Sequence, residues 1–218
     1  MKILNLYACL GGNRYKWNEV KKDIEVTAVE LDEELARLYQ ERFPNDKVII
    51  ADAHQYLLDH YKEYDFIWSS PPCPTHSRIN ISQYTRDCWK PRYPDMALYQ
   101  EIIFLKHYYK GRYCVENVIP FYNSLIPAEK RNRHLYWTNF KLPNTLSTRK
   151  NPDLSRTKNL ITALSNFHDY DFRKYKGSQR KNKIARNLVD YEAGKTILES
   201  VLNINKNNYI QTDLFDES

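Results

Sequence analysis

Short apolar segments alternate with amphipathic segments along the first 140 residues, and this order limits the folds open to the chain. The short segments are rich in β-branched residues, whereas the longer ones repeat apolar residues at helical spacing. Strands that alternate with helices are typical of a parallel sheet covered on both faces. The sequence therefore predicts a doubly wound, mostly parallel α/β sheet. The predicted strands are 3–8, 24–30, 47–51, 65–69, 113–116 and 134–140, and the predicted helices are 32–43, 53–61 and 94–110.

The remainder of the chain differs in periodicity and charge. Periodicity fades over 141–181, helical spacing returns over 183–202, and a polar tail follows from 205 to 218. Residues 129–186 hold 15 Lys or Arg and four Asp or Glu, against 33 and 27 in the whole chain, so the rest is acidic on balance. A basic segment on an acidic body predicts a surface that binds a polyanion such as nucleic acid.

The four cysteines and the absence of long apolar runs bear on location and metal binding. Cys9, Cys73, Cys88 and Cys114 form no CxxC pair, and no charged and apolar leader follows Met1, so we expect reduced thiols in a cytoplasmic protein. No apolar stretch approaches the ~20 residues that span a bilayer. A zinc site around Cys73 and Cys88 lacks a fourth ligand at suitable spacing, so we expect no metal.

A rigid turn follows the predicted strand 65–69. Pro71 and Pro72 fix two φ angles and offer no backbone N–H, and the next residue is Cys73. The turn places this thiol at the carboxyl edge of the sheet, where open α/β folds bind their ligands. Cys73 is therefore a candidate nucleophile, with a buried structural cysteine as the alternative.

Three further features end successive predicted strands and together predict a nucleoside cofactor. Gly11 and Gly12 allow close backbone approach, Glu30 can accept both ribose hydroxyls, and Asp52 can accept from an exocyclic amine. Neither a Walker lysine pattern nor a full GxGxxG is present, which favours S-adenosylmethionine over NAD. Glu116 ends the fifth strand, which brings a carboxylate near the Cys73 turn.

The order of these segments and their residues resemble the DNA cytosine-5 methyltransferase family, most closely its compact members of phage and prophage origin. The resemblance covers nearly the whole chain in the family's linear order. It rests on residues 5–12, Glu30-Leu31-Asp32, Asp52-Ala53, Pro71-Pro72-Cys73, Glu116-Asn117-Val118, Arg131-Asn132-Arg133 and 186–189. The chain departs from the family at Tyr7, Cys9 and Pro74, and its arginine motif lacks the leading glutamine.

The resemblance implies methyl transfer from S-adenosylmethionine to C5 of a flipped-out cytosine in DNA, through a covalent adduct on Cys73. Glu116 would stabilise N3 of the base, and either Arg131 or Arg133 would hold the base or its phosphate. The implied cofactor-binding residues are Tyr7, Gly11, Gly12, Glu30, Leu31, Asp52, Ala53, Pro72 and Asn187.

The resemblance also implies a separate role for each of several successive segments of the chain. Residues 1–140 would form the catalytic and cofactor-binding core, 141–181 a small basic target-recognition segment, and 182–204 a C-terminal helix that returns to the core. The loop 75–92, with Gln83, Tyr84 and Arg86, would act as a lid. In the tail, Gln211, Leu214 and Phe215 resemble a peptide that docks on the bacterial sliding clamp.

Three other functions stay open at this point. RNA in place of DNA is a possible substrate on the same fold. Ser70-Pro71-Pro72 also resembles the start of the motif by which amino-methyltransferases stack a base, although Cys73 stands where that motif has an aromatic residue. A non-catalytic DNA-binding or decoy subunit is the third alternative.

Overall fold

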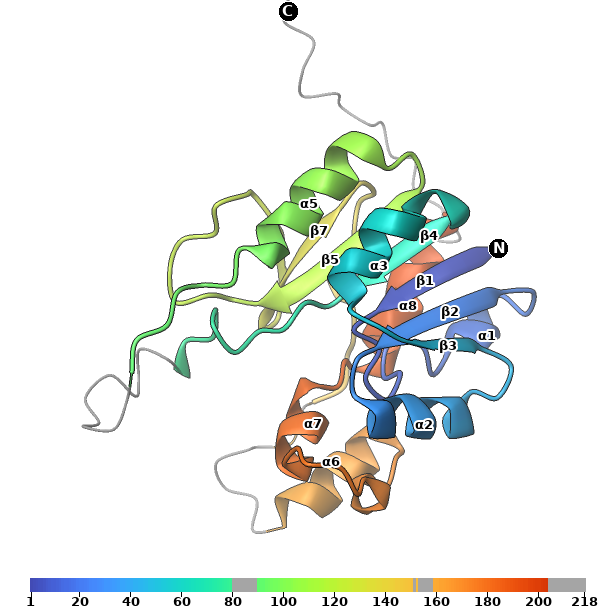
Figure 1. Ribbon diagram of the computed structural model, residues 1–218, viewed down its shortest axis with the longest axis vertical. Coiled ribbons are helices and arrows are strands. Elements are labelled where there is room, and N and C mark those ends of the chain that lie inside the picture. Colours follow the sequence, from blue (N-terminus) through green and yellow to red (C-terminus); the bar gives the residue numbers. More distant parts are fainter. Residues whose placement is uncertain (80–89, 151, 153–158, 204–218) are drawn as a thin grey trace, which may run out of the picture.

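The computed structural model describes residues 1–79, 90–150, 152 and 159–203, and these form a seven-stranded sheet of order β3-β2-β1-β4-β5-β7-β6 (Figure 1). The five strands from β3 to β5 are parallel, whereas β7 runs antiparallel to both β5 and β6. The predicted mostly parallel sheet is confirmed. Strand bounds are β1 Lys2–Leu6, β2 Glu25–Glu30, β3 Lys47–Ile50, β4 Phe66–Ser69, β5 Arg112–Val118, β6 Glu129–Arg131 and β7 His134–Thr138.

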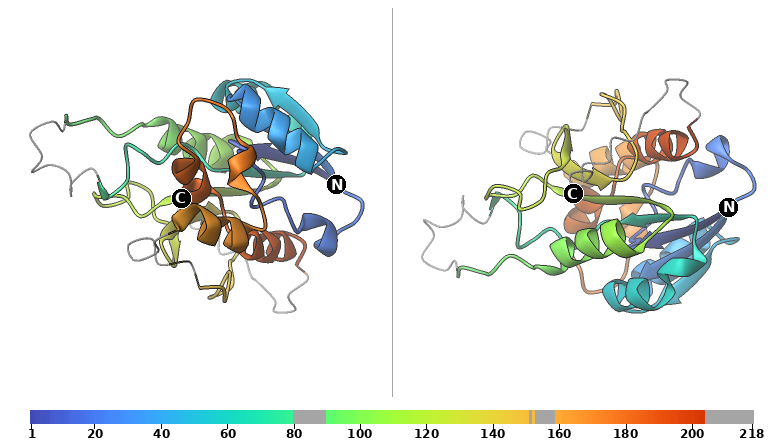
Figure 2. Two further views of the ribbon diagram at one scale, coloured as in Figure 1. Left: turned by 90° about the horizontal axis from the view of Figure 1, so that it is seen from below. Right: turned by 90° about the horizontal axis from the view of Figure 1, so that it is seen from above.

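Helices cover both faces of this sheet (Figure 2). Side chains from α3 and α5 pack on one face with Leu4, Ile67 and Val115, and side chains from α1 and α8 pack on the other with Ile3 and Trp68. The helices are α1 Trp17–Val20, α2 Glu33–Arg42, α3 Ala53–His60, α5 Ala97–Tyr108, α6 Leu160–His168, α7 Lys181–Asn187 and α8 Tyr191–Val201, with the 3₁₀ turns η1 Tyr61–Glu63 and η2 Phe172–Lys174.

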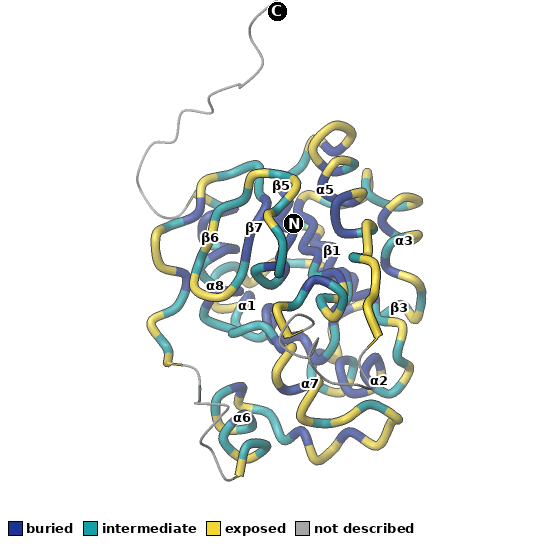
Figure 3. Tube along the Cα trace, turned by 90° about the vertical axis from the view of Figure 1, so that its left-hand side faces the viewer, coloured by how far each residue is buried: buried dark blue, intermediate teal, exposed yellow. Residues whose placement is uncertain are grey.

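The central strands are buried on both faces, which explains their near-continuous apolar sequences. Figure 3 shows β1, β5 and β7 as mainly buried, whereas α3 and α6 carry exposed stretches on their outer sides. The chain leaves β1 toward β2 on one side, and β4 pairs with β1 on the other. Such a reversal of strand order opens a crevice at the carboxyl ends, where open α/β sheets bind ligands.

Two predictions about the C-terminal third are wrong. The single helix predicted over 183–202 is two helices, because Leu188 has an extended backbone and the Asp190 side chain caps α8 by accepting the N–H of Glu192 (3.1 Å). The stretch 141–181 holds α6 and η2 where we expected no periodic structure. α6 packs with α7 and α2 around Leu10, Leu164 and Phe172 (Figure 1).

Two of the sequence predictions concern the predicted lid and the C-terminal tail. The lid residues Gln83, Tyr84 and Arg86 and the clamp-like residues Gln211, Leu214 and Phe215 lie outside the described residues. Within the described part of the chain, no helix has both the length and the apolar composition needed to cross a bilayer.

Candidate active site

A cavity of about 330 Å³ lies at the carboxyl ends of the central strands. Its walls come from the segments that follow β1, β4 and β5, from the turn between β6 and β7, and from α6 and α7. Cys73 and Glu116 line this cavity together with Gly12 and Glu30. Residues that are distant in sequence and chemically distinct therefore face one space.

Cys73 is held by a turn that is fixed at both ends. Before it, the side-chain amide of Asn117 donates to the carbonyl oxygen of Pro71 (2.9 Å), which ties the turn to the end of β5. After it, the backbone N–H groups of His76 and Ser77 donate to the carbonyl oxygen of Cys73 (3.0 and 3.1 Å). The thiol is half-buried and faces the cavity from a constrained backbone.

The surroundings of Cys73 favour the neutral thiol. Burial raises the pKa of Cys73 above its ordinary value, and the negative charge of Glu116 acts in the same direction. The backbone N–H of Cys73 and the charge of Lys183, on α7, act in the opposite direction. Glu116 itself is only 7% exposed at the end of β5. Nucleophilic attack by this thiol therefore requires a change in the charge around it.

Glu30 is positioned by backbone groups of the neighbouring loop. Its carboxylate accepts the N–H groups of Cys9 (2.8 Å) and Asp32 (3.0 Å). Burial raises the pKa of Glu30, and these backbone hydrogen bonds oppose that effect. The loop after β1 bends sharply, with positive φ at Tyr7, Cys9 and Gly11 (55°, 49° and 65°). It thereby brings the Cys9 N–H to the end of the neighbouring strand β2.

At Gly12 the loop after β1 comes close to the backbone of the segment between α7 and α8. A Cβ atom added there would lie 2.3 Å from the carbonyl oxygen of Val189 and 2.6 Å from Cγ of Leu188. Only glycine therefore allows the segment between α7 and α8 to lie against the loop after β1. Leu188 and Val189, from the segment that the resemblance expects to return to the core, lie against this loop.

The cavity brings together most, but not all, of the residues singled out from the sequence. Asp52 is exposed and caps α3 by accepting the N–H of Gln55 (2.9 Å), and Leu31 is 66% exposed. The predicted residues that line the cavity are Tyr7, Gly12, Glu30, Pro72, Cys73, Glu116, Arg131, Arg133 and Asn187, whereas Gly11, Leu31, Asp52 and Ala53 lie outside its lining.

The two arginines left open by the sequence differ in their contacts. Arg131 donates to the carbonyl oxygens of Pro143 (2.6 Å) and Leu142 (3.1 Å) and pairs with Glu129. Its guanidinium therefore holds the following segment against β6. Arg133 is exposed, and its side chain makes no hydrogen bond or ion pair with the other described residues. Arg133 is the arginine that is available to a ligand.

Sequence reasoning missed a buried polar network behind the cavity. Glu101, on α5, is 1% exposed and accepts hydrogen bonds from the hydroxyls of Tyr7 (2.6 Å) and Ser69 (2.6 Å). Its carboxylate also lies 3.0 Å from Nδ1 of His54. The network joins the loop after β1 to the end of β4. Glu101 is the one charged residue among the buried positions of α5, so no sequence motif indicated it.

A second missed residue is His134, which opens β7 and lines the cavity. Its Nε2 lies 3.5 Å from Oε1 of Glu116. The sequence placed His134 next to Arg133 but gave no sign of this contact, because it depends on the antiparallel pairing of β5 with β7.

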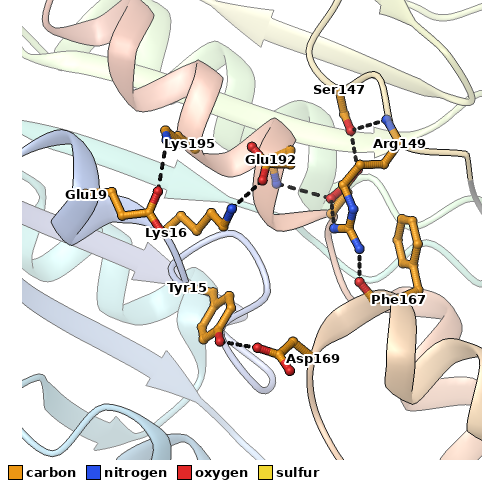
Figure 4. A network of polar contacts seen from close by, with 10 residues as sticks. Tyr15, Lys16, Glu19, Ser147, Arg149, Phe167, Asp169, Glu192 and Lys195 are labelled. Carbon is orange, nitrogen blue, oxygen red and sulfur yellow. Dashed lines mark hydrogen bonds and ion pairs between the residues drawn. The ribbon is translucent and has the colours of Figure 1, made fainter.

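The basic segment is attached to the core by Arg149 (Figure 4). Its guanidinium pairs with Asp190 (2.7 Å), donates to the carbonyl oxygen of Phe167, and lies over the rings of Phe167 (4.0 Å) and Tyr191 (3.8 Å). Figure 4 also shows Tyr15 donating to Asp169. Among the described residues, no group of three His, Cys, Asp or Glu side chains could hold a metal ion.

A family model described as C-5 cytosine-specific DNA methylase matches residues 1–118, which is more than half of the 218 residues. The chain belongs to this family. The resemblance noted from the sequence is thereby confirmed. No curated protein sequence matches the chain.

A solved structure shares its fold over nearly the whole chain, and two others are similar to part of it. The methyltransferase EhMeth of Entamoeba histolytica is 11% identical over 95% of this chain and 99% of its own, with a TM-score of 0.54. A DNMT2 variant of Spodoptera frugiperda is 27% identical over 57% of this chain and 37% of its own, with a TM-score of 0.40. A putative DNA modification methyltransferase from an Escherichia coli prophage is 17% identical over 57% and 34%, with a TM-score of 0.37. The matched part of this chain thus spans about a third of the length of the last two proteins.

Proposed function

We propose that this methylase-family protein transfers a methyl group from S-adenosylmethionine to C5 of a cytosine in DNA, through a covalent adduct on Cys73. The observation that supports this most directly is the shared cavity. Cys73 and Glu116 line one part of it, and Gly12 and Glu30 line another. A nucleophile, an acid and a nucleoside pocket in one space are what this chemistry requires.

The residues present fit S-adenosylmethionine. Glu30 already accepts two backbone N–H groups, and its carboxylate keeps further lone pairs for ribose hydroxyls. Gly12 lines the cavity on the loop after β1, and Tyr7, Pro72 and Asn187 add to the walls. Asp52 and Leu31 lie at the exposed ends of β2 and β3 and would contact the base of the nucleoside. When bound, S-adenosylmethionine supplies an electrophilic methyl group.

The side chains of the cavity can carry the remaining chemistry. Cys73, as the thiolate, forms a bond to C6 of cytosine while the electrons of the ring move toward N3, which takes a proton from Glu116. C5 then gains the methyl group and loses its proton. The bond between Cys73 and C6 breaks as the ring electrons return, and N3 gives its proton back to Glu116. The proton of C5 passes to solvent water, and the thiolate of Cys73 leaves with the electron pair of its bond to C6.

The raised pKa of Cys73 fits this order of events. In the free protein the thiol holds its proton at neutral pH, which protects it from other electrophiles. A proton on Glu116 removes one of the two causes of the raised pKa, and the charge of Lys183 favours the thiolate throughout. The nucleophile would therefore form when the acid is in place.

DNA binding would fall to the basic part of the chain. The target base must leave the duplex, at a cost of roughly a few kcal/mol. Arg133 is free to contact the flipped base or its phosphate, and the segment 141–181 would contact neighbouring DNA. Only about forty residues are available for reading the site, so we expect a short recognition sequence and strongly salt-dependent binding.

Trapping on DNA that contains 5-fluorocytosine tests the proposal. Fluorine at C5 cannot leave as a proton, so the adduct should accumulate with the wild type and S-adenosylmethionine. Cys73→Ala should form none, whereas Cys88→Ala, which removes a different thiol, should still form it. An adduct with Cys73→Ala would overturn the role of Cys73. A parallel assay on transfer RNA decides the substrate, since methylation of RNA alone would reassign it.

A further inference from the structure

The contact between Glu116 and His134 follows from the pairing of two strands. β5 and β7 are antiparallel, with Glu116 opposite Tyr136 and Val118 opposite His134. Residues two apart on a strand share a face, so Glu116 and His134 are diagonal neighbours on the cavity side. The distance of 3.5 Å between Nε2 and Oε1 allows an ion pair when the imidazole is protonated. Such contacts often tighten when the substrate binds.

The two side chains differ in exposure. The side chain of Glu116 is 9% exposed and that of His134 is 36% exposed, so the histidine reaches water while the carboxylate does not. Arg131 is engaged by Glu129 and by backbone carbonyls, and the ring of Tyr136 makes an edge contact with that of His134. Cys73 and Tyr136 interact electrostatically with Glu116, and Arg131, Arg133 and Lys183 are among the charged groups that line the same cavity.

We infer that His134 is a positioning residue that holds a proton for Glu116, on which the acid step of the proposed methylation depends. This role rests on the function proposed above. When cytosine enters, the Nε2–H bond of the imidazolium breaks and an O–H bond forms on Glu116. That O–H bond breaks in turn as N3 of the base gains the proton, and the sequence reverses on product release. His134, being partly exposed, takes up this proton from water before cytosine enters.

With this arrangement, a single proton transfer to Glu116 also favours the thiolate of Cys73. A charged Glu116 opposes the thiolate of Cys73, yet both lie in one cavity and act on one ring. A proton delivered to Glu116 creates the acid and removes that opposing charge in the same step. Among the ion pairs of the described residues, the one that involves Glu116 is that with His134.

Release of tritium from C5 of cytosine in duplex DNA, without any methyl donor, tests this inference. Addition of Cys73 to C6 lets C5 take a proton from water, and reversal then frees the tritium. The rate thus reports the acid-assisted addition alone. We expect His134→Phe to lower it by about 10- to 100-fold, at or below the usual range for a general acid. Affinity for DNA should change less than about twofold, because His134 is proposed to act on Glu116 and not on phosphate.

Two further variants separate this role from a structural one. In a Glu116→Gln background, His134→Phe should cost nothing more, because residues that act as one unit are not additive. His134→Gln keeps a donor but cannot store a proton. Its tritium-release rate should therefore begin to fall at a lower pH than that of the wild type on the alkaline side of the profile.

The outcomes are distinct. An equal loss from His134→Phe with and without Glu116, or an unchanged pH profile for His134→Gln, would overturn the role of His134 while wild-type release and adduct trapping stand. No tritium release by the wild type on either DNA or RNA would instead overturn the proposed function, and this role with it. Binding of S-adenosylmethionine by each variant, measured by calorimetry, shows that the cavity is folded.

Discussion

Residues 1–118 and residues 129–203 differ in how they are held in place. The first part is the region matched by the family model, and its strands are buried between apolar helix faces. The second part packs on the first through the pairing of β7 with β5 and through apolar side chains of α8, and polar contacts such as Lys16 with Glu192 add to these. The first part carries Cys73 and Glu116, the proposed nucleophile and acid, and residues of the second part complete the lining of the cavity.

The two parts contribute to the site in different ways. A parallel sheet fixes the carboxyl ends of its strands to within the tolerance that catalysis needs, because its strands are packed on both faces. The second part needs only to pack against the edge formed by the carboxyl ends of these strands. Apolar packing of α6 and α7 against α2, around Leu10, Leu164 and Phe172, achieves this together with a few directional contacts. The two parts should therefore respond differently to substitution.

The largest effect is expected where the two parts touch through their backbones. Gly12→Ala would place a Cβ atom 2.3 Å from the carbonyl oxygen of Val189. Because a backbone atom cannot move aside as a flexible side chain can, we expect a loss of roughly 2 kcal/mol or more in the free energy of unfolding. Affinity for S-adenosylmethionine should fall as well. Urea unfolding and isothermal titration measure the two effects, and wild-type values in both would show that the loop after β1 does not lie against the segment between α7 and α8.

A smaller effect is expected at Arg149, whose contacts join its segment to the start of α8 within the second part. Arg149→Ala removes an ion pair and two ring contacts while leaving Asp190 half-buried, so we expect a loss of about 1–3 kcal/mol. Arg149→Lys keeps the charge but not the planar stacking, and should recover only part of that loss. Thermal unfolding of each variant is the measurement.

Arg173→Ala is the matched control. Arg173 also pairs with a carboxylate, that of Asp171, but its side chain is 71% exposed. Pairs at such positions contribute little, so the midpoint of unfolding should stay close to that of the wild type. Equal shifts for Arg149→Ala and Arg173→Ala would mean that burial and stacking at Arg149 add nothing.

The sequence allowed more of the first part than of the second to be predicted. The positions of the parallel strands, the Cys73 turn, Glu30 and Glu116 could be predicted from local patterns, each of which lies at or near the end of a strand. The break between α7 and α8 did not, since Leu188 and Val189 continue the apolar spacing while their backbone packs on Gly12. The contact of His134 with Glu116 and the burial of Glu101 depend on which strands and helices meet. Such partners are set by tertiary structure, which periodicity does not encode.

The smallest expected effect depends on pH and distinguishes the polar contacts of the two parts. The hydrogen bond to Glu101 raises the pKa of His54 above 6.5. A histidine whose pKa is raised on folding stabilises the protein fully below its unfolded pKa, and this contribution is lost as the pH rises through the folded value. The wild type should therefore unfold at a higher temperature than His54→Gln at pH 5.5, and the difference should shrink by pH 8.5. Arg149 stays charged over this range, so the deficit of Arg149→Ala should not follow that pattern. A His54→Gln deficit that is equal at both values of pH would mean that Glu101 is held by Tyr7 and Ser69 without a contribution from the charge on His54.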